Sequence, residues 1–150
     1  MGGISSVRIL LWSSSSLHSI INTHKLNLTH ISGGCWILKI KKKHGGGASV
    51  LGKMWQDMIL ATIGECFEEP DVVGVTISIR KLHDLISVWN ADNRNDEIRF
   101  RIGEKMKEIL DLEASTIIEY KSHAVSMQDM STFRNAKAYV FAAASEPSQA

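Results

Sequence analysis

Hydrophobic and polar positions follow a regular pattern along the middle of the chain. Residues 35–43 alternate, with Trp36, Leu38 and Ile40 on one side, which is typical of a half-buried strand. After a glycine-rich break at residues 44–47, apolar residues recur at helical spacing and predict an amphipathic helix. Its stripe consists of Leu51, Met54, Trp55, Met58, Ile59 and Ile63. This part of the chain is therefore expected to form a strand followed by a helix.

Two further alternating segments predict a β-hairpin. Residues 72–80 and 85–90 would be its strands, and the four residues between them would be its loop. Pairing the strand ends puts Arg80 opposite Leu85, so Arg80 and Trp89 share the less apolar face of the sheet. The core-forming face is expected to carry Val75, Ile77, Ile79, Ile86 and Val88.

The last part of the chain adds a second helix and two more strands. Asn95 is suited to cap a helix, and Asp96 and Glu97 favour its positive N-terminal end. The buried stripe of this helix consists of Ile98, Ile102, Met106, Ile109 and Leu110. Strands are expected over residues 116–121 and 138–141. The order strand, helix, strand, strand, helix, strand predicts an α+β fold with a largely antiparallel sheet.

The composition is that of an ordinary single-domain protein. The chain has 150 residues, of which 44% are hydrophobic and 22% are charged. No apolar run approaches the roughly 18–20 residues that a bilayer span needs. Cys35 and Cys66 are too few for a disulfide framework, which favours a reducing compartment. We therefore expect a cytoplasmic protein with no membrane partner.

Charge is distributed unevenly along the chain. Residues 1–53 contain seven Lys or Arg residues and no acidic residue, whereas the remainder contains 10 basic and 16 acidic residues. A basic first third indicates a phosphate ligand or a transit signal. The acidic remainder argues against sequence-blind coating of nucleic acid.

Residues 1–32 are rich in serine and carry one short apolar run, residues 7–12. A poorly ordered leader is the first interpretation of this segment. Two alternatives stay open. The first six residues fit the N-myristoylation pattern, with Gly2 as the acceptor. The second alternative is a mitochondrial transit peptide, although Arg8 is the only arginine of residues 1–32. Residues 142–150 carry no pattern and are expected to form a flexible tail.

One segment resembles an enzyme motif. Residues 47–53 match the G-x-x-x-x-G-K core of a phosphate-binding loop, but Met54 follows where Ser or Thr should bind Mg²⁺. The preceding strand also alternates with lysines, whereas the parallel strand of such a fold is buried on both faces.

The six histidines and two cysteines show no zinc-ligand spacing, and no nucleophile has a placed base. We therefore expect a binding protein with no catalytic residue, metal or cofactor, and keep a nucleotide hydrolase as a rival.

Four segments resemble the eukaryotic translation initiation factor 4E family in order and spacing. They are residues 33–36, the helix from Trp55 to residues 63–65, the hairpin from residues 78–80 to 87–90, and residues 119–123. The family holds the methylated 5′ cap of mRNA. The resemblance implies a cap-binding domain over residues 33–141, with a curved antiparallel sheet backed by helices on one face. The last two segments look most like the divergent class of the family.

The resemblance also implies roles for individual residues. Arg80 would bind the phosphates of the cap and Trp89 would contact its methyl group, while Trp36 and Trp55 would be structural. In the family, two tryptophans sandwich the positively charged methylguanine, which adds a cation–π energy of about 0.5–2 kcal/mol per face. The surface that would bind a short helical motif of an initiation scaffold or inhibitor protein consists of Asp57, Leu60 and Gly64.

The chain departs from the family pattern in several places. Cys35 stands where a basic residue often helps to hold phosphate, and Leu85 replaces a second phosphate-binding lysine. Residues 24–27 lie where family members carry a Trp-Glu pair, and Trp12 has no matching context. The domain is therefore expected to be incomplete at the N-terminus. The implied function is binding of capped mRNA in translation initiation or its regulation. The alternative is a variant deficient in cap binding that keeps part of the partner surface.

Overall fold

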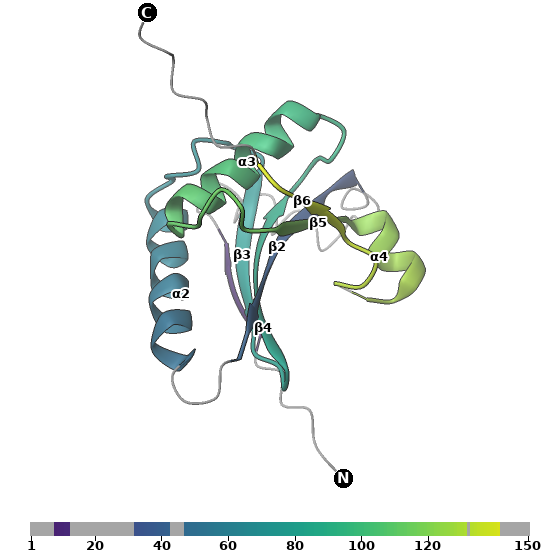
Figure 1. The fold of residues 1–150 in the computed structure, drawn as a ribbon. Helices are drawn as coiled ribbons and strands as arrows, with labels where there is room; N and C mark the ends of the chain where they lie inside the picture. Colours follow the sequence, from purple (N-terminus) through teal and green to yellow (C-terminus); the bar gives the residue numbers. More distant parts are fainter. Residues whose placement is uncertain (1–7, 13–31, 43–46, 132, 142–150) are drawn as a thin grey trace, which may run out of the picture.

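The computed structural model describes residues 8–12, 32–42, 47–131 and 133–141 (Figure 1). Its elements in chain order are β1 (Arg8–Trp12), β2 (Gly34–Lys41), α2 (Gly47–Ile63), β3 (Val72–Ser78), β4 (His83–Asn90), α3 (Asp96–Ile109), β5 (Ile118–Ser122), α4 (His123–Asp129) and β6 (Lys137–Tyr139). The predictions for Gly2 and for residues 142–150 lie outside the described residues.

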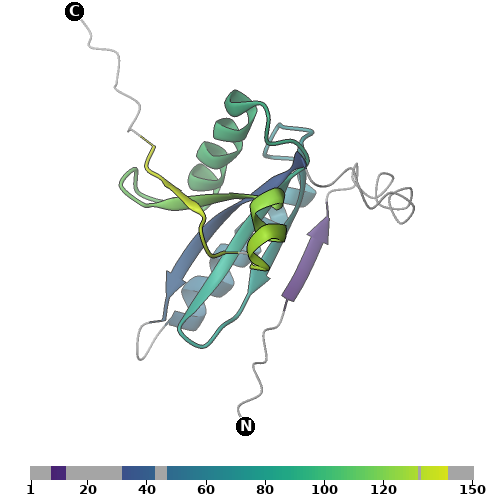
Figure 2. The same ribbon diagram turned by 90° about the vertical axis from the view of Figure 1, so that its right-hand side faces the viewer.

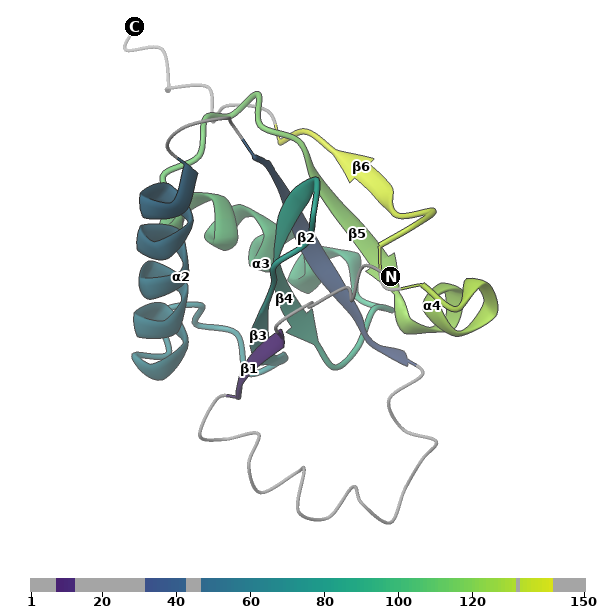
Figure 3. The same ribbon diagram turned by 90° about the horizontal axis from the view of Figure 1, so that it is seen from below.

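The strands form one antiparallel sheet in the order β1-β3-β4-β2-β5-β6. Helices α2 and α3 cover one face of this sheet, whereas α4 lies on the other side (Figures 1 and 3). In Figure 2 the view from that side places α4 in front of the strands. The predicted α+β fold, a curved antiparallel sheet backed by helices, is confirmed. Helix α4 is absent from the sequence prediction.

Strand β1 departs from the expectation of a poorly ordered leader over residues 1–32. It pairs with β3 from Arg8 opposite Ser78 to Trp12 opposite Gly74. The reason is that an apolar run with branched and aromatic residues has strand propensity, and β3 offers it a row of backbone hydrogen-bonding groups at the sheet edge. Residues 1–7 and 13–31 lie outside the described part, so the expectation stays untested there.

The register of the predicted hairpin is wrong by two residues. Ser78 lies opposite Leu85, and Gly74 lies opposite Trp89. Strand β3 ends two residues earlier than expected, and the backbone N–H of Arg80 donates to Asp84 Oδ1 at 3.0 Å, which closes the turn over residues 79–82. Because a shift of two preserves the faces, the predicted core residues still point towards the helices, except for one. That exception is Ile79, which lies in the turn and is 37% exposed.

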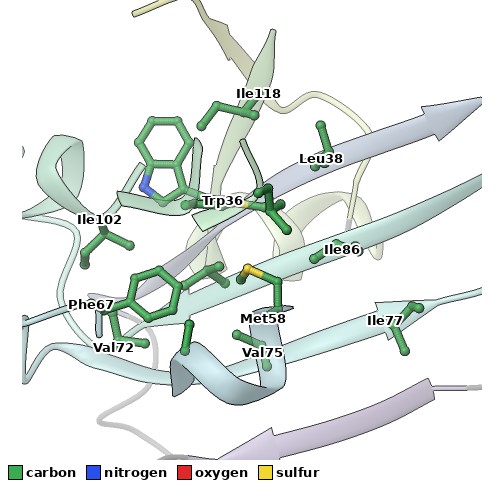
Figure 4. Packing of buried hydrophobic residues seen from close by; sticks show 14 of the residues in the cluster. Trp36, Leu38, Met58, Phe67, Val72, Val75, Ile77, Ile86, Ile102 and Ile118 are labelled. Atoms are coloured by element: carbon green, nitrogen blue, oxygen red, sulfur yellow. The ribbon is translucent and has the colours of Figure 1, made fainter. Parts of the chain in front are cut away.

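The core lies between the sheet and the two long helices (Figure 4). Trp36 is fully buried at its centre, and its Nε1–H donates to the carbonyl oxygen of Arg99 at 2.9 Å. A glycine at position 103 of α3 is required here, because a Cβ atom would lie 2.8 Å from Trp36 Cε2. The helix can therefore approach the indole ring directly. Other buried members of the core include Met58, Phe67, Val75, Ile86, Ile102 and Ile118.

The helix predictions hold with two adjustments. The Asn95 side chain accepts from the backbone N–H of Ile98 at 3.2 Å and caps α3 as predicted. Helix α2 begins at Gly47, four residues before the expected stripe, so part of the glycine-rich segment is helical. Ile63 was assigned to the buried stripe but is 64% exposed, because it is the last residue of α2 and extends past the packed turns.

Candidate ligand-binding site

The sheet face opposite α2 and α3, called here the α4 face, collects the polar candidates. Because side chains alternate along strands, the antiparallel registers place alternate residues of neighbouring strands together on this face. These residues are Cys35, Ile37, Lys39 and Lys41 of β2, Thr76 and Ser78 of β3, His83, Leu85, Ser87 and Trp89 of β4, and Glu119 and Lys121 of β5.

Trp89 lies at one end of the α4 face and is half-buried. Its Nε1–H donates to Thr76 Oγ1 at 3.0 Å, and its ring stacks on His123 with centroids 5.1 Å apart and planes 23° apart. The backbone N–H of His123 donates to the carbonyl oxygen of Gly33 at 2.9 Å, which ties the start of α4 to the start of β2. Only glycine fits at position 33, since a Cβ atom would lie 2.3 Å from the carbonyl oxygen of Asn90. Local backbone packing thus fixes the aromatic pair.

Arg80 lies at the other end of the face, just beyond β3. Its guanidinium carbon is 4.2 Å from the ring centroid of Phe133, a cation–π contact. Phe133 also packs against the buried cluster of Cys35, Ile37 and Leu85 and meets the ring of His83 edge-on at 5.9 Å. Sequence reasoning missed Phe133, because no periodicity marks a single aromatic residue in a loop.

The loop that carries Phe133 is anchored by a buried lysine. The side chain of Lys121 is 0% exposed, and its Nζ donates to both carboxylate oxygens of Asp129 at 2.8 and 2.6 Å. The same ammonium group donates to the carbonyl oxygen of Ser131 at 2.7 Å and to that of Arg134. Its hydrogen bond holds the pKa of the Asp129 carboxyl below its ordinary value, against the opposing effect of desolvation. All donors of this buried cation are therefore satisfied.

In the middle of the α4 face, Lys39 is paired with Glu119 and Lys121 with Asp129. Cys35 and Leu85, where the family pattern has basic residues, are both buried beneath Phe133. Burial raises the pKa of the Cys35 thiol to about 12, against the smaller, lowering effect of Lys121. The thiol is therefore neutral at physiological pH and is unsuited to nucleophilic or redox chemistry.

Two of the predicted partner-binding residues, Asp57 and Leu60, lie on α2, and Gly64 follows its last residue, on the opposite side of the sheet from the α4 face. Asp57 pairs with Lys53 at 2.7 Å, Leu60 is 59% exposed, and the N–H of Gly64 donates to the Leu60 carbonyl oxygen at 2.8 Å at the helix end. Beyond this end lies a pocket of about 330 Å³. Its lining includes Glu65, Glu68 and Glu69 beside Phe67 and Pro70.

Trp36 and Trp55, predicted to be structural, both face the core, the first fully buried and the second partly. The structure thus brings Arg80 and Trp89 onto one face and separates them from the α2 surface.

The rival nucleotide site does not form as a phosphate-binding loop. Residues 47–53 belong to α2, and Lys53 is engaged by Asp57, which raises its pKa through a hydrogen bond and charge attraction. Within the described residues, no group of three or more His, Cys, Asp or Glu side chains could hold a metal ion. No helix in that part of the chain is long and apolar enough to cross a membrane.

Comparisons with known proteins agree with this geometry. The family model of eukaryotic initiation factor 4E matches residues 27–138. The eukaryotic translation initiation factor NCBP of Oryza sativa subsp. japonica is 35% identical over 105 residues, which are 69% of this chain and 44% of that protein. The chain spans less than half the length of the curated relatives it matches.

Two solved structures share the fold. One is Caenorhabditis elegans eIF4E-3 in complex with the 4E-binding protein Mextli, with a TM-score of 0.62 and 27% identity over 67% of this chain and 57% of that chain. The other is Ascaris suum eIF4E-3 with m7G cap, with a TM-score of 0.59 and 30% identity over 66% of this chain and 55% of that chain. With the family model covering most of its length, the chain belongs to the eukaryotic initiation factor 4E family.

Proposed function

We propose that the chain binds the 7-methylguanosine cap of mRNA on the α4 face and acts in translation initiation or its regulation. The observation that carries this proposal is the placement of Trp89 and Arg80 on one face of the sheet. An aromatic ring suits the positively charged methylated base, and a guanidinium suits the phosphates. The structure of Ascaris suum eIF4E-3 with m7G cap supports the choice of ligand.

The proposed domain is residues 33–141, and the family match over residues 27–138 supports this extent. Its action is binding without catalysis, in the cytoplasm. The neutral Cys35 thiol and the helical conformation of residues 47–53 support the non-enzymatic assignment.

Titration with methylated cap analogue and with unmethylated GTP, followed by tryptophan fluorescence, tests this function. We expect the methylated ligand to bind more tightly, and Trp89→Leu to weaken that preference by about 2- to 30-fold, because about 0.5–2 kcal/mol of cation–π energy is lost. Trp55→Phe, on the helix side of the sheet, is the matched control and should keep the preference. Equal affinity of the wild-type protein for both ligands would contradict the proposal.

We propose further that the exposed side of α2 binds a short helical motif of an initiation scaffold or inhibitor protein. Asp57, Leu60 and Gly64 would contribute to this surface, and the exposed Ile63 beside them enlarges its apolar area. The complex of Caenorhabditis elegans eIF4E-3 with the 4E-binding protein Mextli supports a partner of this class.

Leu60→Ala is expected to weaken binding of a 4E-binding peptide by about fivefold or more, because interface residues that carry binding energy cost over about 1 kcal/mol when truncated. Fluorescence anisotropy of a labelled peptide measures the effect. Leu82→Ala, at the exposed hairpin tip, removes an equal side chain elsewhere and should leave peptide affinity unchanged. If both variants bind the peptide like the wild-type protein, Leu60 has no part in the surface.

A further inference from the structure

Three basic or titratable residues line up across neighbouring strands at the hairpin end of the α4 face. The β2–β4 register places Lys41 opposite His83. The β3–β4 register ends with Ser78 opposite Leu85, so Arg80, two residues on, lies at the level of His83. The ring of Phe133, which contacts both Arg80 and His83, supports this alignment independently. With strands about 4.8 Å apart, the backbones of Arg80 and Lys41 are roughly 10 Å apart.

The cations at this end differ in whether an ion pair already engages them. Lys39 pairs with Glu119 at 2.7 Å, and Lys42 pairs with Asp84 at 3.3 Å. Lys41 is exposed, and so is Lys81, which follows Arg80 in the turn. Neither of these two lysines has an ion-pair partner among the described residues. They are therefore available to an external anion.

Lys41, His83 and Arg80 form a row that lies in the direction in which a phosphate chain would leave Trp89. His83 is six residues before Trp89 on β4, which corresponds to about 20 Å along the strand. Between them the face carries Leu85 and Ser87 of β4, both buried, and Lys39 of β2, which is already paired with Glu119. A polyanion that leaves Trp89 along this face therefore passes the Lys39–Glu119 ion pair and reaches Arg80, and then Lys41 and Lys81.

We propose that Lys41 and Lys81 bind the phosphodiester backbone of the RNA that follows the cap. This inference rests on the proposed cap-binding function, because the cap would fix the direction of the RNA chain. Single-stranded RNA is the ligand class that matches a short cationic row at the exit of a nucleotide site, since its backbone supplies regularly spaced negative charges.

The test compares free cap analogue, a short capped oligoribonucleotide and the same oligoribonucleotide without a cap. The wild-type protein should bind the capped oligoribonucleotide more tightly than the free cap. In the double variant Lys41→Ala, Lys81→Ala this gain should disappear, with a loss of up to about fivefold for each lysine. The slope of log affinity against log salt concentration should fall in magnitude by about 0.7 per lysine. Affinity for the free cap should stay the same.

Lys137→Ala is the matched control, because Lys137 is exposed on β6 opposite Tyr120, on the helix side of the sheet. This variant should retain the full gain. A gain that persists in the double variant, or a wild-type protein that binds cap but gains nothing from the attached RNA, would overturn the inference and leave cap binding intact. Lysine-dependent binding of the uncapped oligoribonucleotide, without any preference for a cap, would support the phosphate site and reject the cap-binding function.

Discussion

Arg80→Ala is expected to weaken binding of a triphosphate-bearing cap analogue by roughly 10- to 150-fold. The reason is the loss of a charge-assisted hydrogen bond to phosphate, about 1.5–3 kcal/mol. In the structure Phe133 supports the guanidinium from 4.2 Å, so the charge is held in place before a ligand arrives. Isothermal titration calorimetry at several salt concentrations would measure the loss, and the variant should show less dependence on salt than the wild-type protein.

Two companion variants sharpen this experiment. Arg80→Lys keeps the charge but loses the planar group that stacks on Phe133, so its affinity should lie between the other two. Arg134→Ala removes an exposed positive charge from the loop of Phe133 and should have little effect. Equal retention of the wild-type protein and Arg80→Ala on a cap-analogue resin, above the level of an uncapped control resin, would remove Arg80 from the site.

Lys121→Met is expected to lower the free energy of unfolding by about 3–5 kcal/mol. The substitution removes a fully buried ammonium group, deprives two loop carbonyls of their donor and leaves the Asp129 carboxylate with the N–H of Ser131 and the amide of Asn135 but without its countercharge. Denaturant unfolding followed by circular dichroism would measure the change. Lys105→Met is the matched control: its ion pair with Glu108, at 3.1 Å, lies at the surface of α3, so its loss should change the free energy of unfolding much less than the loss of Lys121.

The Lys121–Asp129 ion pair is also expected to make the stability of the protein depend on pH. The pKa of Asp129 is lowered in the folded protein, chiefly by the hydrogen bond from Lys121. Its contribution to stability is therefore present above the ordinary aspartate pKa, near 3.9, and is lost as pH falls through the lower folded value. The difference in stability between wild type and Lys121→Met should shrink over that acidic range. A difference that stays constant from neutral pH to the acid limit would show that Asp129 is not the group responsible.

The helix–sheet core was predictable because its residues obey simple periods. Trp36, Met58 and Ile86 follow the strand and helix patterns, and each is fully buried where the pattern expects it. The errors lie at the ends of strands and helices, because the hydrophobic periodicity does not determine where an element stops. The turn of the β3–β4 hairpin depends on the hydrogen bond from Arg80 to Asp84, and the exposure of Ile63 depends on where α2 ends relative to its neighbours.

The candidate site was only partly predictable, since half of it comes from a loop. Arg80 and Trp89 could be assigned to one face from strand alternation alone, because a two-residue error in register leaves the faces unchanged. Phe133 and Asp129 could not be assigned, as their places depend on the hydrogen bonds of the buried Lys121 to Asp129 and to two carbonyl oxygens of the same loop. A lysine between Tyr120 and Ser122 in a strand normally signals an exposed face, and here it is enclosed by its own loop.

Helix α2 and the α4 face lie on opposite sides of a sheet that is one layer thick. Two large ligands held on these surfaces would be screened from each other by the strands, so neither has to dissociate before the other can associate. With both proposed ligands, assembly would then proceed in either order, and the occupancy of each surface would follow its own ligand's concentration. A repressor docked on α2 would accordingly leave the message attached and would act by excluding a competing scaffold.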